Sequence, residues 1–99
     1  MYNVTFNLDQ SIEQDWINWM KESHIPKVMQ TEMFVENKIY RIMHEQEDGS
    51  VNYSVQYFAE SIDKVLKYQK EFSPKLQADV TERYQDKLIA FRTLLELVG

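Results

Sequence analysis

The chain has 99 residues, 43% of them hydrophobic and 13% aromatic, which is enough for one core and predicts a single domain over residues 1–99. A net charge of −5 with scattered basic residues argues against nucleic acid, which needs a clustered Lys/Arg surface. The lack of cysteine excludes disulfides and thiolate chemistry, and no apolar run reaches the ~18 residues of a membrane span. We expect a soluble, cytoplasmic protein with no membrane partner.

The first half of the chain begins with a strand and continues into a helix. Residues 2–8 alternate between apolar and polar side chains, which is typical of a half-buried strand. Asp9 or Ser11 is expected to cap this helix, and Ser11 with Gln14 fits a capping box. Trp16, Trp19 and Met20 follow at the spacing of a buried helical face. Because proline removes an internal hydrogen bond, Pro26 predicts an interruption of this helix near His24.

The second half predicts three strands and another helix. A long strand is expected over residues 33–46, followed by a tight hairpin turn at Asp48-Gly49. Residues 51–58 alternate cleanly and predict a third strand. Ser61 caps a second helix, Pro74 predicts its interruption, and residues 88–98 are expected to form the last strand.

An internal repeat indicates how these elements are arranged. Trp19-Met20-Lys21-Glu22 is followed by Pro26-Lys27, and Tyr68-Gln69-Lys70-Glu71 is followed by Pro74-Lys75. Each copy lies in a helical stretch with a predicted strand on either side, so the chain has two β-α-β halves. This predicts a ferredoxin-like βαββαβ sandwich, an α+β fold. It has a four-stranded antiparallel sheet in the order 4-1-3-2 and two interrupted helices on one face.

In this arrangement the other face of the sheet has no helix to cover it. We expect this face to carry polar and apolar residues together: Thr5, Asn7, Arg41, Met43, Ser54, Gln56, Phe58, Arg92, Leu94 and Glu96. The apolar residues of such a face are costly to leave in contact with water. This predicts a homodimer formed through the open sheet face, pairing as a dimeric α+β barrel with a partly polar cavity between the sheets.

Several motifs resemble a known family. They are Trp16-x-x-Trp19-Met20, His24-Ile25-Pro26-x-Val28-Met29, Val55-Gln56-Tyr57-Phe58 and Ala90-Phe91-Arg92-Thr93-Leu94-Leu95-Glu96. Together they resemble a small bacterial family of unknown function, found mainly in Bacteroidetes. The resemblance implies the shape of the dimeric α+β barrel group. That group includes cofactor-free quinol monooxygenases, haem-degrading enzymes, small isomerases and non-catalytic ligand binders, so it leaves the function open.

The residues suited to chemistry are few. His24 is the candidate for a proton shuttle or a substrate hydrogen bond, and the alternative is that it caps the interrupted helix by bonding a free carbonyl. With only His24 and His44 and no ligand spacing, no metal site is expected. Arg41 and Arg92, both expected on the open face, either form ion pairs at an interface or bind an anion.

Two functions follow from these observations. The first is a structural or small-ligand-binding homodimer without catalytic activity and without a cofactor. The alternative is a cofactor-free enzyme of the monooxygenase or isomerase type, acting on a small oxygen-rich or aromatic substrate. In either case a ligand is expected between the sheet and the interrupted first helix or in the dimer cavity. Its predicted polar contacts are His24, Arg41, Gln56 and Arg92.

Overall fold

The computed structural model describes residues 1–43 and 48–99. Its strands are β1 (Tyr2–Asp9), β2 (Glu36–Arg41), β3 (Ser50–Phe58) and β4 (Leu88–Leu94). Its helices are α1 (Glu13–Trp19), α2 (Ile25–Met29), α3 (Ile62–Glu71) and α4 (Ser73–Tyr84). Between α1 and α2 lies one π-helical turn, Met20–His24, and short 3-10 turns precede α1 and β4.

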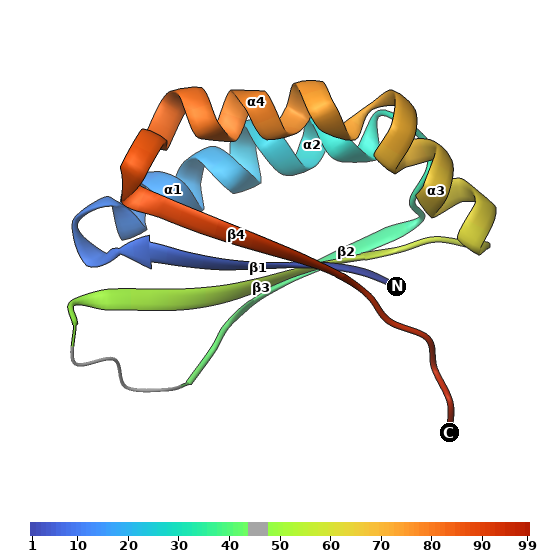
Figure 1. Cartoon of the computed structure of the whole chain (residues 1–99), viewed down its shortest axis with the longest axis horizontal. Helices are drawn as coiled ribbons and strands as arrows, with labels where there is room; N and C mark the ends of the chain where they lie inside the picture. Colours follow the sequence, from blue (N-terminus) through green and yellow to red (C-terminus); the bar gives the residue numbers. More distant parts are fainter. Residues whose placement is uncertain (44–47) are drawn as a thin grey trace.

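The sheet has the predicted topology. All of its pairings are antiparallel, and the strand order is β2-β3-β1-β4, which confirms the predicted order 4-1-3-2. The helices α1 to α4 lie on one side of the sheet (Figure 1), while the opposite side carries none of the helices of the described ranges. The predicted α+β, ferredoxin-like sandwich is therefore confirmed.

The core lies between the helices and the two central strands. Alternate residues of β1, from Tyr2 to Leu8, and of β3, from Val51 to Tyr57, point toward the helices and are buried. Trp16 packs between the rings of Phe6 and Tyr53, with ring centroids 5.0 and 4.9 Å away. The period of two along each strand thus sorts the apolar side chains onto one face, as the sequence predicted.

The edge strands are shorter than predicted. β2 begins at Glu36 instead of residue 33, because Glu32 takes a positive φ of 63° and Phe34 turns into the core. Ile42 extends the pairing by one hydrogen bond to Asn52, Met43 is outside the strand, and residues 44–46 of the predicted strand, with His44, lie outside the described residues. β4 ends at Leu94 rather than residue 98, since its pairing with β1 ends at Met1, which accepts a hydrogen bond from the Leu95 N–H.

The two prolines act differently. Pro26 does not break its helix: the π turn passes directly into α2, and the Ile25 N–H bonds to the carbonyl of Met20 five residues earlier. Pro74 does coincide with a break, at Phe72, where the backbone has φ −117°. The expectation of a short segment after each proline holds for α2 but is wrong for α4, which has 12 residues.

The predicted faces of the edge strands are wrong. Arg92 and Leu94 lie opposite Val4 and Tyr2, so both belong to the helix side of the sheet. Arg41 lies opposite Tyr53 and is likewise on the helix side. Met43 follows the end of β2, and Glu96 follows the end of β4. Both phases of residues 88–94 contain apolar side chains, so periodicity alone could not decide between them.

The face assignment of the central strands predicts a contrast between two Val→Ala changes. Val55 is fully buried, so Val55→Ala should lower the free energy of unfolding by about 2 kcal/mol through lost packing and a residual cavity. Val35, which is 62% exposed, should lose less than about 0.5 kcal/mol for the same change. Urea denaturation measures both, and equal losses would contradict the assigned core.

Candidate functional site

A small cavity lies between the sheet and the helices. Its volume is about 20 Å³, enough for one ordered water molecule. Its walls come from β1, β3, β4, α3, α4 and the π turn, and its lining residues are Tyr2, Val4, Phe6, His24, Tyr57, Tyr68, Ser73, Leu76, Gln77, Val80 and Arg92. The cavity therefore combines apolar walls with a small number of hydroxyl, imidazole, amide and guanidinium groups.

His24 is the most unusual residue of this cavity. It is only 7% exposed, and its Nδ1 has no hydrogen-bond partner among the described residues. Its ring stacks on Trp19, with centroids 5.1 Å apart. The expected alternative, in which His24 caps a free carbonyl, finds no support, because no hydrogen bond from this Nδ1 is present in the described part of the chain.

Burial also fixes the charge state of His24. Desolvation lowers the pKa of His24 to about 4, an effect that Asp79 opposes and Lys27 and Arg92 reinforce. The imidazole is therefore neutral at pH 7. Trp16 Nε1 is also buried without a partner in residues 1–43 and 48–99, but Trp16 is enclosed by aromatic rings, whereas His24 faces a cavity. A buried polar atom without a partner calls for an explanation, and beside a cavity a bound water or ligand supplies one.

The cavity opens beside Arg92. Every other lining residue is buried except Gln77 of α4, so the route to solvent runs between α4 and the edge strand β4. The four ion pairs of the described residues do not include Arg92. An exposed guanidinium without a counter-ion thus stands at the mouth of the cavity, with its aliphatic stem against the core.

The local backbone explains why His24 points inward. In the first repeat, three residues separate Glu22 from Pro26, and in the second, two residues separate Glu71 from Pro74. The extra residue of the first repeat coincides with the π turn, which is the usual structural result of a one-residue insertion in a helix. His24 and Ser73, from the corresponding segments of the two halves, both line the cavity.

Two of the four predicted contact residues lie elsewhere. Arg41 pairs with Glu13 of α1, with 3.2 Å between Nε and Oε2, and the same carboxylate accepts a hydrogen bond of 2.6 Å from the Tyr53 hydroxyl. Burial and this hydrogen bond raise the pKa of Tyr53 to about 12. Gln56 is on the open face and donates to Ser54. The structure thus brings together His24 and Arg92 but not Arg41 or Gln56.

Other cavity residues were missed by sequence reasoning. Tyr57 and Tyr68 fit the pattern of core residues, so nothing in their spacing distinguished them from ordinary core. Ser73 and Gln77 lie one turn apart on α4, and the Gln77 amide donates to the Ser73 hydroxyl at 2.6 Å. The one available signal was the position of Ser73 in the repeat, next to Pro74 as His24 is close to Pro26.

Larger hollows are present on the surface. One of about 440 Å³ lies beside the first turn of α3 and is lined by Met1, Ile62, Val65 and Leu97 among others. Another of about 250 Å³ lies at the α3–α4 break. In the described ranges, no group of three His, Cys, Asp or Glu side chains is placed to hold a metal ion. None of the helices in those ranges has the length and apolar character to span a bilayer.

With the fold and the cavity established, comparison with known proteins places the chain in a family. It belongs to the family described as a domain of unknown function, DUF4286, whose model matches residues 1–98. None of the curated proteins is detectably related to it by sequence.

Two solved structures are similar in shape. An ethyl tert-butyl ether D (EthD) family protein from Bacillus halodurans is 12% identical with a TM-score of 0.64, covering 97% of this chain and 99% of that one. A de novo designed protein with a ferredoxin fold is 17% identical with a TM-score of 0.53, covering 99% and 87%. At these identities the likeness supports the fold alone.

The buried, neutral His24 predicts a pH dependence of stability. In the unfolded chain this histidine takes a proton near its ordinary pKa of 6.5, whereas in the folded protein it does so near pH 4. The free energy of unfolding should therefore fall as the pH is lowered from about 6.5 to 4, by about 3 kcal/mol from this residue.

The variant His24→Phe retains the stacking on Trp19 and removes the titration. Urea denaturation at several pH values measures both proteins, and the carboxylates contribute equally to each. The difference in unfolding free energy between wild type and variant should change by about 3 kcal/mol between pH 7 and 4. A difference that is constant with pH would show that His24 is solvated in the folded protein.

Proposed function

We propose that this protein is a homodimer that associates through its open sheet face and binds a small ligand without catalysing a reaction. The observation that carries the dimer is the composition of the open face. Its residues, assigned from the strand register, are Asn3, Thr5, Asn7, Asp9, Glu36, Lys38, Tyr40, Ser50, Asn52, Ser54, Gln56, Phe58, Ile89, Phe91 and Thr93.

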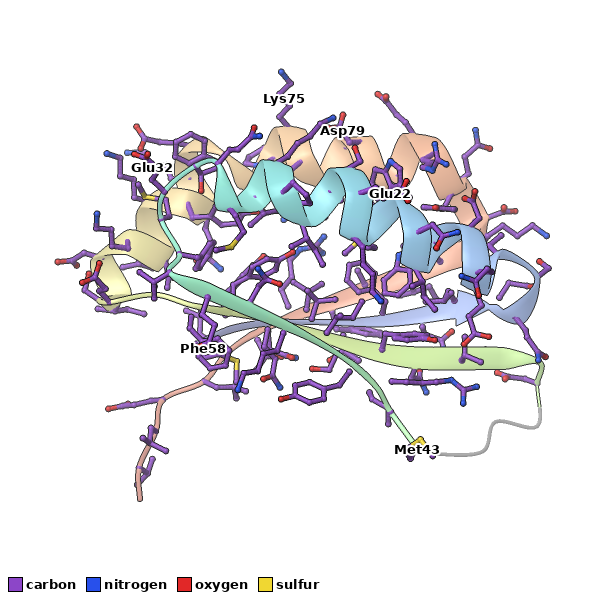
Figure 2. The ribbon with its side chains drawn as sticks, turned by 180° about the vertical axis from the view of Figure 1, so that it is seen from behind. Glu22, Glu32, Met43, Phe58, Lys75 and Asp79 are labelled. Atoms are coloured by element: carbon purple, nitrogen blue, oxygen red, sulfur yellow. The ribbon has the colours of Figure 1, made fainter. Side chains whose placement is uncertain are left out.

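This face carries fewer charged residues than the chain as a whole, and its β4 edge is mostly apolar. Three of its 15 residues, Asp9, Glu36 and Lys38, are charged, which is 20% compared with 27% of the whole chain. Ile89 and Phe91 on β4 are 57% and 61% exposed, and Tyr40 on β2 is 48% exposed. Figure 2 shows Phe58 on the same side of the sheet, away from the helices. Depletion of charge with exposed aromatic residues is typical of an interface.

The polar centre of the face is already satisfied. Asn7 donates to Ser50 and Asn52 at 3.1 and 2.8 Å, and Ser54 donates to Asn3 at 2.6 Å. Because these groups bond to one another, covering them costs less than covering unpaired polar atoms. A two-fold axis parallel to the strands would set the apolar β4 edge of one protomer over the β2 edge of its partner.

The dimer predicts a difference between two matched substitutions. Ile89 on the open face and Ile62 on α3 are both 57% exposed, so Ile89→Glu and Ile62→Glu make the same change in the same exposure. Sedimentation at tens of micromolar should show dimers for wild type and Ile62→Glu. Ile89→Glu should be a folded monomer, with a dimer dissociation constant at least 100-fold higher.

Circular dichroism confirms that each variant is folded. A monomeric wild type, or a dimeric Ile89→Glu, would contradict this interface. The cytoplasmic location expected from the sequence, and the bacterial origin implied by the resemblance, remain predictions.

The ligand-binding part of the proposal is supported by His24 and Arg92 at one cavity. The second candidate, a cofactor-free enzyme acting on a small oxygen-rich or aromatic substrate, is favoured by His24, which lines that cavity and whose Nδ1 has no partner among the described residues. However, an imidazole whose pKa is about 4 is a weak base at pH 7, and general bases work best when their pKa is near the operating pH. For this reason binding is preferred to catalysis.

A further inference from the structure

The buried cavity and the cation at its mouth together indicate a class of ligand. We infer that the cavity binds the carboxylate group of a small organic acid, with Arg92 as counter-ion and His24 as a hydrogen-bond donor at the inner end. This inference rests on the ligand-binding part of the proposed function and not on the dimer, because every lining residue comes from one protomer.

The volume of the cavity limits which part of a ligand can enter it. A volume of about 20 Å³ holds one water-sized group, such as a water molecule or one oxygen of a carboxylate, but not an aromatic ring. The remainder of a larger ligand must therefore extend past Gln77 and Arg92 toward solvent, since these are the lining residues that are not buried. A carboxylate at the end of a short chain has this shape.

Charge favours an anion. Arg92 forms none of the ion pairs in the described part of the chain, and a guanidinium fits a carboxylate with two parallel hydrogen bonds. The cavity also lies along the first two turns of α4, from Ser73 to Val80, where the unpaired N–H groups of the helix start contribute positive potential.

Hydrogen bonding favours an oxygen ligand. His24 is more than nine-tenths buried and neutral, so one of its two ring nitrogens carries a proton that it can donate. Its Nδ1 has no hydrogen-bond partner within residues 1–43 and 48–99. The Ser73 hydroxyl accepts from Gln77 and can donate its own proton either to the neighbouring Tyr68 hydroxyl or to a ligand. A carboxylate oxygen accepts from both kinds of donor.

Two other charged groups near His24 have to be considered. Lys27 adds to the positive potential, whereas Asp79 opposes it. Figure 2 shows Asp79 on the outer side of the helical layer, away from the sheet. Neither Asp79 nor any other carboxylate is among the residues that line the cavity. The ligand therefore meets one cation and no anion at the cavity wall.

The test is a titration followed by nuclear magnetic resonance, with the His24 ring nitrogens and the Arg92 Nε–H as reporters. The probe is sodium acetate at pH 7, and sodium chloride at the same ionic strength is the reference. Acetate should give saturable shifts at both residues, with a dissociation constant in the millimolar range for so small a ligand. Shifts that are linear in concentration, or equal in chloride, would overturn the inference.

Two substitutions that each remove one positive charge, Arg92→Gln and Lys87→Gln, distinguish binding at this cavity from a general electrostatic effect. Arg92→Gln should raise the dissociation constant for acetate at least tenfold, and Arg92→Lys should raise it less. Lys87→Gln, just before β4, removes the same charge away from the cavity and should change the constant less than twofold. Equal effects of Arg92→Gln and Lys87→Gln would also overturn the inference.

The dimer variant separates this inference from the proposed assembly. Acetate should bind monomeric Ile89→Glu as tightly as wild type, because the cavity is complete within one chain. If wild type is dimeric and acetate does not bind, the ligand class is wrong while the dimer stands. If acetate binds and wild type is monomeric, the dimer is wrong while the site stands.

Discussion

The constraint on which the rest of the structure depends is the alternation of side chains along the two central strands. Because successive residues of β1 and β3 point to opposite faces, Tyr2 to Leu8 and Val51 to Tyr57 supply one continuous apolar surface. The helices cover this surface. The intervening Asn, Ser and Thr residues are left on the other face, where they bond to one another. One periodicity therefore defines both the core that surrounds the cavity and the face proposed for association.

The second constraint is the extra residue of the first repeat. A regular helix through residues 20–26 would direct the Pro26 ring against a carbonyl of the preceding turn. The π turn absorbs one residue and carries the chain past this clash without ending the helix. It also places His24 against Trp19 and into the cavity. In the second repeat, without the extra residue, the helix instead breaks at Phe72 and Ser73 occupies the cavity wall.

The strength of each local signal explains how much could be predicted. The fold and strand order followed from the repeat and from the clean alternation of β1 and β3. The faces of Arg41 and Arg92 did not, because the edge strands are amphipathic in neither phase: residues 88–94 place Leu88, Ala90 and Leu94 on one side and Ile89 and Phe91 on the other. Register is set by pairing with β1, which periodicity within β4 cannot reveal. The meeting of His24 with Arg92 was expected, and it occurs at one of the two predicted places, between the sheet and the first helix, although Arg92 had been assigned to the open face.

The environment of His24 in the cavity distinguishes two roles that the sequence alone left open, proton transfer and hydrogen bonding to a ligand. A histidine kept for proton transfer has a pKa near neutrality, which needs a carboxylate partner or water to stabilise its charged form. His24 has an apolar surround and no partner at Nδ1 in the described part of the chain, and its pKa falls to about 4. Such an imidazole remains a neutral donor across the physiological range. Together with the unpaired guanidinium of Arg92, it is better suited to holding an oxygen ligand than to moving a proton.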